Sequence, residues 1–376
     1  MLTIAFTGGG TGGHIYPGLA VLSYIKKLLP ACRLFWIGSD SGMDRTIVEG
    51  AGVEFFGIPS GKLRRYFSVQ NFSDTFKVGA GFFNARKILK REKPKLLFSK
   101  GGFVSVPPCA AAASLKIPVF SHESDFSPGL ATRINARFSE RIFIPYKESM
   151  AHYQGRSGEK AFVSGNPIRP EFAHADPKKG FSFLGLKEDE KILLVLGGSQ
   201  GSRELNNLVS QSLPELSRYY TVVHQYGEAN TADTASAGAQ GKAYLPFAYL
   251  GEELPHIIAA SELVLCRSGA GTIWECKNLN KAMVLVPLRG SGTRGDQVEN
   301  ARLFEKRGAA ICFIPDSDVH SQGGVDTEKF TQLIALLAED PQRRKAMEEA
   351  KIMEGDAAQF IAEEIVRRIN YSGLVQ

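Results

Sequence analysis

A glycine-rich run near the start of this 376-residue chain has the residue types and spacing of a phosphate-binding loop. Residues 8–13 (GGGTGG) follow the apolar run 2–6 and satisfy the pattern GxGxxG. Glycines in this pattern let the backbone approach a phosphate, whose charge is met by free amides at a helix N-terminus. A dinucleotide-binding fold also expects an acid about 20 residues later, at the end of the second strand. Here Asp40 lies just beyond that strand, so a nicotinamide enzyme and a ligand-free tight turn both stay open.

His14 follows this run, and its imidazole could take the proton of an acceptor hydroxyl because a histidine pKa lies near neutrality. The alternative is a histidine that caps or packs the turn. His122 and Glu123 follow the apolar run 119–121 and are further candidates for an acid or a base. The next acid, Asp125, could bind a ligand or cap a helix. The two histidines are more than 100 residues apart, which is no metal-binding spacing.

A second glycine turn, with Gly101 and Gly102 after Lys100, follows the strand-like run 96–98. Loops that follow the strands of a parallel sheet lie at the same edge, so we expect this turn beside residues 8–13. Two glycine turns together suit a pyrophosphate. Taken alone, each could equally be an ordinary strand-to-helix turn.

The second half of the chain has candidate ligand-binding turns of its own. Residues 267–272 (RSGAGT) precede a helix-like segment, and small residues at a helix N-terminus suit a diphosphate. Glu275 on that helix could accept both hydroxyls of a ribose, or it could stabilise the helix dipole. Asp296 and Gln297 could bind sugar hydroxyls or cap a helix. Residues 316–318 (DSD) could hold a divalent metal, but Asp is also common in turns.

Short apolar runs alternate with helix-like segments along the whole chain, which is the βαβ rhythm of a parallel sheet. The expected strands are residues 2–6, 34–37, 53–58, 96–98, 119–121, 142–144, 192–196, 220–224, 263–266, 283–286 and 310–313. The expected helices are residues 17–29, 129–138, 271–279, 297–307 and 357–369. We therefore predict an α/β protein with two Rossmann-like doubly wound domains that face each other across a cleft.

The strand pattern restarts after residues 165–167, which sets the predicted domain boundaries. The first domain spans residues 1–165, and the second spans residues 166–350. The polar stretch 166–190 is expected to be a linker. The C-terminal segment 351–376 is expected to form a helix that returns to the first domain.

Composition excludes several classes of protein. The chain is 43% hydrophobic and 22% charged, which is typical of a globular protein and not of a disordered one. Its 5 cysteines are odd in number and form no CxxC, so a disulfide framework or zinc module is not expected. No signal peptide is evident, and no apolar run reaches the ~18 residues of a membrane span. We expect a cytoplasmic protein whose membrane contact, if any, is peripheral.

Basic residues concentrate in the first half, with 22 Lys and Arg against 11 Asp and Glu in residues 1–165, and 23 against 28 in the remainder. Ten of the basic residues lie in segment 62–95, interleaved with aromatics. This combination favours docking on an anionic membrane surface, and no nucleic-acid-binding module is recognisable. The alternative is that the aromatics pack in the core and the charges form a solvated face. The membrane-contact candidates are Arg64, Arg65, Tyr66, Phe67, Phe72, Phe76, Phe82, Phe83 and Lys87.

These motifs, in this order, resemble the MurG family, the peripheral-membrane N-acetylglucosaminyltransferases of peptidoglycan synthesis. The matching segments are residues 8–17, 101–107, 122–129, 165–169, 197–201, 267–275 and 296–301. The resemblance implies a glycosyltransferase B fold, an N-terminal domain for the lipid-linked acceptor and a C-terminal domain for UDP-GlcNAc. It implies no cofactor and no metal.

The resemblance also implies roles for individual residues. Donor-binding residues would be Thr11, Gly12, Gly13, Asp125, Arg169, Ser199, Gln200, Phe247, Ala248, Arg267, Ser268, Gly269, Ala270, Thr272, Glu275 and Gln297. Acceptor-binding residues would be Gly10, Gly12, Gly13, His14, Gly101 and Gly102. The suggested base is His14, with Glu123 in reserve. One departure is Asp125, where the family commonly has Asn, because a carboxylate cannot donate hydrogen bonds as an amide does.

The expected reaction is an inverting, metal-independent transfer of GlcNAc from UDP-GlcNAc to the muramyl C4 hydroxyl of lipid I, which gives lipid II. The expected partners are the donor, the undecaprenyl-pyrophosphoryl-muramyl-pentapeptide acceptor and an anionic membrane surface at the cytoplasmic face, with no nucleic acid. Alternatives are a glycosyltransferase for another lipid acceptor or UDP-sugar, a UDP-GlcNAc epimerase, and a non-catalytic nucleotide-sugar-binding scaffold at the membrane.

Overall fold

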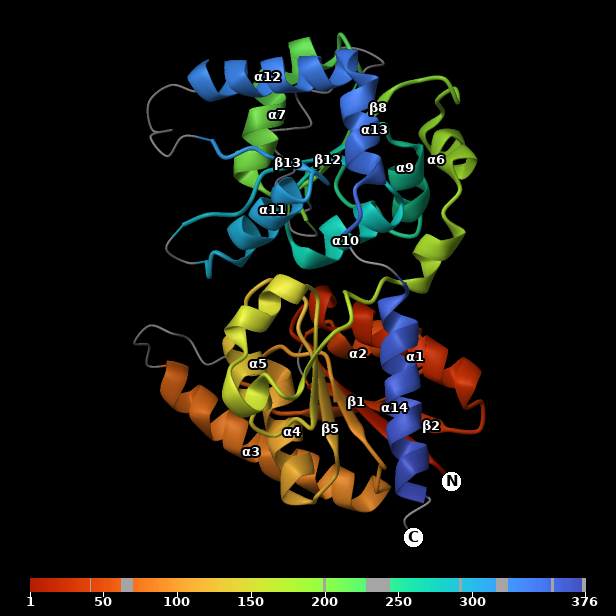
Figure 1. Ribbon diagram of the computed structural model, residues 1–376, viewed down its shortest axis with the longest axis vertical. Coiled ribbons are helices and arrows are strands. Elements are labelled where there is room, and N and C mark those ends of the chain that lie inside the picture. Colours follow the sequence, from red (N-terminus) through yellow and green to blue (C-terminus); the bar gives the residue numbers. More distant parts are fainter. Residues whose placement is uncertain are drawn as a thin grey trace. The chain divides into compact units, whose positions relative to one another are not determined.

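The computed structural model divides the chain into two compact units (Figure 1). The first comprises Met1–Pro170 and Gly355–Gln376, and the second comprises Glu171–Glu354. The structure describes residues 1–40, 42–61, 70–198, 201–227, 244–290, 293–315, 324–352 and 355–373. Because the first unit extends to Pro170 rather than to residue 165, Arg169 belongs to the N-terminal unit.

A sheet with the strand order β3-β2-β1-β4-β5-β6-β7 forms the centre of the N-terminal unit, and its described strand pairs are parallel. The strands are β1 (Thr3–Thr7), β2 (Arg33–Ser39), β3 (Glu54–Ile58), β4 (Leu97–Ser99), β5 (Val119–His122), β6 (Arg141–Ile144) and β7 (Ala161–Val163). The expected strands of this half are confirmed, and β7 is an addition. The apolar pattern missed β7 because it is a three-residue edge strand whose Phe162 and Val163 are exposed.

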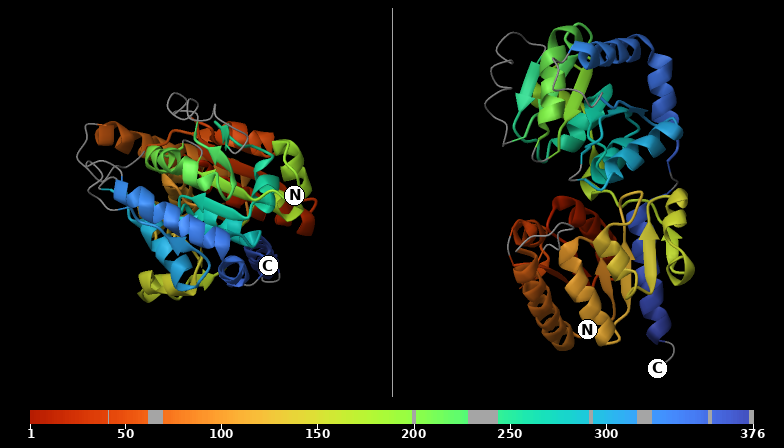
Figure 2. Two further views of the ribbon diagram at one scale, coloured as in Figure 1. Left: turned by 90° about the horizontal axis from the view of Figure 1, so that it is seen from above. Right: turned by 90° about the vertical axis from the view of Figure 1, so that its left-hand side faces the viewer.

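Helices cover both faces of this sheet, as the right-hand view of Figure 2 shows. They are α1 (Tyr16–Leu28), α2 (Asp44–Gly50), α3 (Gln70–Glu92), α4 (Val106–Ser114), α5 (Leu130–Asn135) and α14 (Ala357–Gly373). Successive residues of β1 point to opposite faces of the sheet. Ile4 and Phe6 therefore pack with Trp36 in the core beneath α1 and α14, whereas Ala5 packs with Phe35 in the core beneath α3 and α4.

The C-terminal helix α14 packs against α1 (Figure 1). Ala358, Ile361, Ala362 and Ile365 are spaced along one helical face and join the core of β1. On the polar side, Glu364 is buried and forms ion pairs with Arg141 and Arg367. The last helix of the chain is therefore part of the N-terminal unit.

The C-terminal unit repeats this plan around a sheet with the order β10-β9-β8-β11-β12-β13, again parallel at its described pairs. The strands are β8 (Ile192–Leu196), β9 (Thr221–Gln225), β10 (Tyr244–Phe247), β11 (Leu263–Cys266), β12 (Ala282–Leu285) and β13 (Ile311–Cys312). The helices are α6 (Pro177–Leu184), α7 (Arg203–Leu216), α9 (Leu254–Ala260), α10 (Ala270–Asn278), α11 (Asp296–Lys306), α12 (Gly324–Glu339) and α13 (Pro341–Glu349). Sequence reasoning missed β10, which contains Pro246 and accordingly lies at the sheet edge.

The predicted linker 166–190 is wrong over Pro177–Leu184, which forms helix α6. Asp176 caps this helix, because its Oδ1 accepts a hydrogen bond of 3.0 Å from the amide of Lys178. Gly185 ends it in the left-handed conformation, with a φ of 66°. Gly180 lies against α9, where a Cβ would come within 2.3 Å of the His256 carbonyl oxygen. The small residue therefore allows the close approach of the two helices.

Candidate active site

The two glycine turns of the N-terminal unit pack directly against each other. Thr7 pairs with Ser99 at the ends of β1 and β4, so the loops that follow these strands are neighbours. Gly102 has a φ of 78°, and a Cβ on it would lie 2.6 Å from the carbonyl oxygen of Gly9. Gly10 has a φ of 85°, and a Cβ on it would lie 2.6 Å from the Cε1 atom of Phe103. The predicted shared edge is confirmed, and glycine is required at these positions.

His14 lies where the two turns meet. It ends the short 3₁₀ segment η1 (Gly12–His14), which Thr11 precedes. A Cβ on Gly102 would lie 3.0 Å from its Cδ2 atom, and a Cβ on Gly101 would lie 3.8 Å from its Nδ1 atom. The ring is half-buried. The imidazole is thus held against the second glycine turn, at the end of the first.

A buried carboxylate, Asp44, holds the first glycine turn in place through hydrogen bonds to backbone amides. Its two oxygens accept hydrogen bonds of 2.9 Å from the amide of Gly10 and 3.0 Å from the amide of Ser39. The residue is 1% exposed, and burial raises its pKa against the opposing effect of these amides. Sequence reasoning did not single out Asp44, because only the fold brings the start of α2 beneath the glycine run.

Glu123 is saturated by hydrogen bonds from its own loop and from α5. Its Oε1 accepts from the amides of Ser124 and Asp125, at 2.8 and 3.1 Å. Its Oε2 accepts from the amide of Gly129 and the hydroxyl of Thr132, at 3.0 and 2.6 Å. Burial raises the pKa of Glu123, but these bonds and the charge of Lys100 more than offset it and hold the pKa below its ordinary value. This geometry suits a residue that shapes the loop better than the reserve base expected from sequence.

Lys100 is a buried cation between the glycine turns and the Glu123 loop. It is 1% exposed, and its Nζ donates a hydrogen bond of 2.7 Å to the Ser124 hydroxyl. That hydroxyl in turn donates to the side-chain oxygen of Asn166 at 2.7 Å. Burial lowers the pKa of Lys100 to about 8, against the attraction of Glu123 and Asp125. The sequence shows a lysine directly before two glycines, but sequence reasoning assigned no role to its charge.

His122 serves the architecture of this region. Its Nε2 lies 2.9 Å from the carbonyl oxygen of Gly165 and donates to it. Burial and the positive charge of Lys100 lower the pKa of His122 well below its ordinary value, so the ring is neutral at pH 7. It ties the end of β5 to the segment that contains Asn166.

Arg169 reaches the start of α1. Its guanidinium carbon lies 5.1 Å from the ring centroid of Tyr16, a cation–π arrangement. The same ring lies against Gly12, where a Cβ would come within 3.0 Å of its Cε2 atom. Arg169 therefore stands beside the first glycine turn, within the N-terminal unit.

In the C-terminal unit, the predicted turns also gather at one edge of the sheet. Leu196, Gln225 and Phe247 are paired across β8, β9 and β10, and Cys266 pairs with Leu196 from β11. The loops that begin after these residues are therefore neighbours. Ala248 follows directly after β10, and its carbonyl oxygen accepts a hydrogen bond from the amide of Gly227. Ser199 and Gln200 lie outside the described residues.

Ser268 and Gln297 are brought together across this edge. The Ser268 hydroxyl donates to the carbonyl oxygen of Gln297 at 2.8 Å, and Asn300 donates to the carbonyl of Ser268 at 3.2 Å. Gly269 caps the N-terminus of α10, which contains Ala270 and Thr272 in its first turn and Glu275 in its second. The helix N-terminus, with its positive dipole end and small residues, suits a diphosphate.

Arg267 has a structural role that its sequence position did not indicate. It is 8% exposed, and its guanidinium donates to the carbonyls of Val286 and Pro287 at 3.0 and 3.2 Å. It also donates to the Ser202 hydroxyl at 2.5 Å and pairs with Glu204 at 2.8 Å. Through these four contacts the guanidinium joins the loops after β8, β11 and β12. This arrangement suits a residue that positions the loops better than one that contacts the sugar-nucleotide donor.

The basic aromatic segment is described from Gln70 onward, as helix α3, so Arg64, Arg65, Tyr66 and Phe67 lie outside the described residues. The side chain of Phe72 is likewise not described. Phe76 is 68% exposed and Phe83 is 71% exposed, and Lys87 is exposed one turn later. Phe82 instead packs against the core, as the alternative interpretation expected. None of the described helices is both long and apolar enough to cross a bilayer.

Comparisons with known proteins agree on the family. Residues 4–144 match the glycosyltransferase family 28 N-terminal domain, and residues 192–365 match the family 28 C-terminal domain. A curated protein of Treponema denticola, named UDP-N-acetylglucosamine–N-acetylmuramyl-(pentapeptide) pyrophosphoryl-undecaprenol N-acetylglucosamine transferase, is 48% identical over 82% of this chain and 83% of its own length. A protein of the same name from Clostridium botulinum is 43% identical over 83% of this chain and 86% of its own length.

Solved structures share the fold at lower identity. Acinetobacter baumannii MurG superposes with a TM-score of 0.74 at 21% identity, over 98% of this chain and 100% of the other. The UDP-GlcNAc 2-epimerase of Neisseria meningitidis superposes with a TM-score of 0.67 at 14% identity, over 98% and 100% of the two chains. The architecture alone does not separate these two activities, whereas the sequence identity to the curated transferases does. The chain therefore belongs to the MurG family of N-acetylglucosaminyltransferases, with the two domains of glycosyltransferase family 28 in a glycosyltransferase B fold.

Proposed function

We propose that this protein transfers GlcNAc from UDP-GlcNAc to the muramyl C4 hydroxyl of undecaprenyl-pyrophosphoryl-MurNAc-pentapeptide, lipid I, and so makes lipid II for peptidoglycan synthesis. The observation that carries the proposal is the identity of 43–48%, over 82–89% of the chain, to curated proteins with this name. The two glycine turns and the N-terminus of α10 are proposed as the sites for the two diphosphates that the reaction requires.

The reaction is a single displacement. The C4 oxygen of the acceptor attacks the anomeric carbon of GlcNAc, the bond from that carbon to the UDP oxygen breaks, and UDP leaves with the electron pair. Attack from the face opposite to UDP turns an α-linked donor into a β(1→4) product. The proton of the attacking hydroxyl passes to a base of the protein.

We assign the base to His14. Its ring lies against both glycine turns and is half-buried, with Nδ1 buried, so the proton is proposed to pass to Nε2. Glu123 is the weaker candidate because both of its oxygens accept hydrogen bonds and its pKa is lowered. Glu123 instead shapes the loop that carries Asp125.

The acceptor diphosphate is proposed to bind at the glycine turns, through backbone amides of Gly12, Gly13 and Gly102. The amides of Gly10 and Gly101 donate to Asp44 and Ser99, so these two glycines are proposed to line the site and shape the turns. Lys100 directly precedes the second turn, and its buried ammonium donates to Ser124 in the adjoining Glu123 loop. A buried ammonium acts in a low-dielectric surrounding, where its attraction for a diphosphate is stronger than in water. Lys100 therefore supports the amides without a metal ion.

The leaving UDP is proposed to be stabilised by the N-terminus of α10, with Ser268 and Thr272 beside it. Glu275 would accept the ribose hydroxyls, and Gln297 would bind the sugar. The uracil would lie beside Phe247 and Ala248, at the carboxyl end of β10.

The protein is proposed to work as a peripheral protein at the cytoplasmic face of the membrane. The two exposed phenylalanines of α3, seven positions apart, would enter the interface, and the basic side chains of the same helix would meet anionic headgroups. This placement would bring the N-terminal unit to its lipid-linked acceptor.

Incubation of the purified protein with UDP-GlcNAc and a short-chain lipid I analogue in EDTA tests the reaction. We expect UDP release together with a product whose mass exceeds that of the acceptor by one GlcNAc residue. Donor alone is the control for an epimerase, and a panel of other lipid hydroxyls and UDP-sugars tests the other transferases. Turnover without acceptor, transfer only to another lipid, or binding without turnover would each contradict the proposal. Strict dependence on added divalent metal would contradict the account of diphosphate binding.

A further inference from the structure

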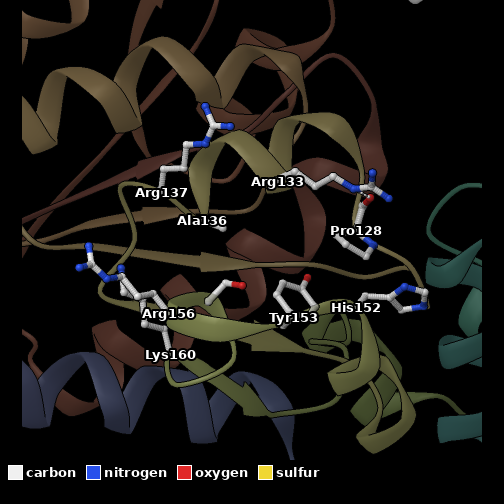
Figure 3. A pocket seen from close by; sticks show the side chains of 9 residues that line it. Pro128, Arg133, Ala136, Arg137, His152, Tyr153, Arg156 and Lys160 are labelled. Atoms are coloured by element: carbon white, nitrogen blue, oxygen red, sulfur yellow. Dashed lines mark hydrogen bonds between the residues drawn. The ribbon is translucent and has the colours of Figure 1, made fainter.

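A cavity of about 470 Å³ lies in the N-terminal unit, between α5 and the two 3₁₀ segments η3 (Lys147–His152) and η4 (Gly155–Ser157) (Figure 3). Four of the side chains that line it are basic: Arg133 and Arg137 from α5, Arg156 from η4, and Lys160 just before β7. None of its described lining residues is acidic. We call this cavity the basic pocket.

The basic pocket contains cations that no carboxylate of the described residues pairs with. Arg137, Arg156 and Lys160 form no ion pair with any carboxylate in the described part of the chain. Arg133 donates its Nε–H to the carbonyl oxygen of Pro128 at 3.1 Å, which leaves its terminal nitrogens for other contacts. The nearby Glu140 is engaged by Arg368, at 2.6 Å. The pocket therefore carries an uncompensated positive charge.

Tyr153 adds a hydrogen-bond donor to the pocket. It is 7% exposed, yet its hydroxyl has no hydrogen-bond partner among the residues that the structure describes. Figure 3 shows this hydroxyl pointing into the space between α5 and the 3₁₀ segments, with Arg137 and Arg156 at one end and Arg133 at the other. Burial, with the charge of Glu123, raises the pKa of Tyr153, so the group remains an O–H donor at neutral pH. A buried hydroxyl without a partner costs free energy that a bound acceptor would recover.

The basic pocket is separated from the glycine turns by α5. One face of α5 holds the active-site loops, because Thr132 donates to Glu123 and Asn135 donates to Ser105 at 2.8 Å. Arg133 and Arg137, four positions apart, line the pocket instead. The pocket is thus not an extension of the proposed acceptor site.

We propose that the basic pocket is a second anion site, which binds a phosphate compound carrying at least two negative charges. Guanidinium groups form bidentate hydrogen bonds with phosphate oxygens. The Tyr153 hydroxyl and Ser157 provide neutral hydrogen-bond donors in the same pocket. A concave site with a buried donor suits a small phosphate group that enters the cavity better than a flat charged surface. The phosphate could be that of a soluble metabolite or of a lipid headgroup, and both present the same chemistry to the pocket.

Titration calorimetry with inorganic pyrophosphate tests this site, in the presence of saturating UDP to occupy the proposed donor site. We expect the double variant Arg137→Gln/Arg156→Gln to raise the Kd about tenfold or more, because two charged contacts are lost. The matched control is Lys95→Gln/Lys147→Gln, which removes the same charge from exposed positions outside the pocket. It should change the Kd by less than about twofold.

Two further variants separate the pocket from the glycine turns. Tyr153→Phe keeps the charge and the ring, and it should weaken pyrophosphate binding about threefold or more through the lost donor. Lys100→Met should leave calorimetric binding at the pocket unchanged. Equal Kd values for the double variant and its control would overturn the proposal, as would loss of all binding in Lys100→Met alone. A titration with short-chain phosphatidylglycerol in place of pyrophosphate distinguishes the two sources of the phosphate. If the lipid binds more tightly than pyrophosphate and the double variant weakens its binding, the site is for a lipid headgroup. If pyrophosphate binds more tightly, the site is for a soluble phosphate compound.

Discussion

Replacing Lys100 by methionine tests whether its buried charge serves function at the expense of stability. The residue is 1% exposed, and burial lowers its pKa from 10.5 to about 8 although Glu123 and Asp125 attract it. At about 1.4 kcal/mol per pH unit, the folded protein holds the charged form at a cost of about 3 kcal/mol. Methionine has a similar length and no charge to hydrate. We therefore expect Lys100→Met to leave the free energy of unfolding at pH 7 unchanged, or to raise it by up to about 3 kcal/mol.

The pH dependence of this effect has a definite sign. The pKa of Lys100 is lower in the folded protein than in the unfolded chain, so between about pH 8 and pH 10.5 the unfolded chain binds more protons. The free energy of unfolding of the wild-type protein should therefore rise through this window. Lys100→Met lacks this rise, and its advantage over the wild type should disappear near pH 10.5.

Tryptophan emission can report on the N-terminal unit alone. The chain has 2 tryptophans, Trp36 and Trp274, so a Trp274→Phe background leaves the fully buried Trp36 as the reporter. Urea unfolding at pH 7 and pH 10 would compare this background with Lys100→Met and with the exposed control Lys95→Met. A loss of more than about 2 kcal/mol in Lys100→Met at pH 7, at unchanged urea dependence, would refute the reasoning. In lipid I analogue assays, the same variant should lower kcat/KM about tenfold or more, because a cation behind the acceptor diphosphate is removed.

Other predictions concern the remaining parts of the site. His14→Ala should lower kcat by about 10²–10⁴-fold with a smaller change in KM if His14 is the base, and an unchanged kcat in steady-state assays would remove it from the mechanism. Asp44→Ala should lower the free energy of unfolding by about 2 kcal/mol in urea titrations, since the buried Ser39 amide and the part-buried Gly10 amide lose their acceptor; a variant as stable as wild type would contradict this. Gly102→Ala should lose activity and stability, because its Cβ would meet the Gly9 carbonyl at 2.6 Å. Phe76→Ser/Phe83→Ser should reduce co-sedimentation with anionic vesicles, and equal binding by both proteins would contradict membrane docking through α3.

Much of the fold was predictable because its signals are local. The apolar runs of buried parallel strands mark β1 to β6, since both faces of each strand are covered. The same reasoning failed for β7 and β10, which are edge strands with exposed residues or a proline. It also failed for α6, where a polar and proline-bearing stretch concealed an aspartate cap and the buried pair Phe181 and Leu184.

Residue roles were predictable only where backbone geometry dictates the residue type. Gly10 and Gly102 require positive φ and a close approach, and the sequence pattern identified both turns. The functions of Glu123 and Arg267 followed instead from their partners. Their side chains bind groups up to 65 positions away, which no local pattern reveals.

By itself, the sequence determined the two parallel sheets, the glycine turns at their edges and the transferase family, because strand alternation and backbone strain depend on neighbouring residues. Only the tertiary structure decided which charged groups are buried and what they face. It set the Lys100 ammonium against Ser124, Asp44 beneath the first glycine turn, and the Tyr153 hydroxyl, which has no partner among the described residues, in a basic pocket. The physical reason is that hydration and pairing of a charge depend on segments that meet only when the chain folds.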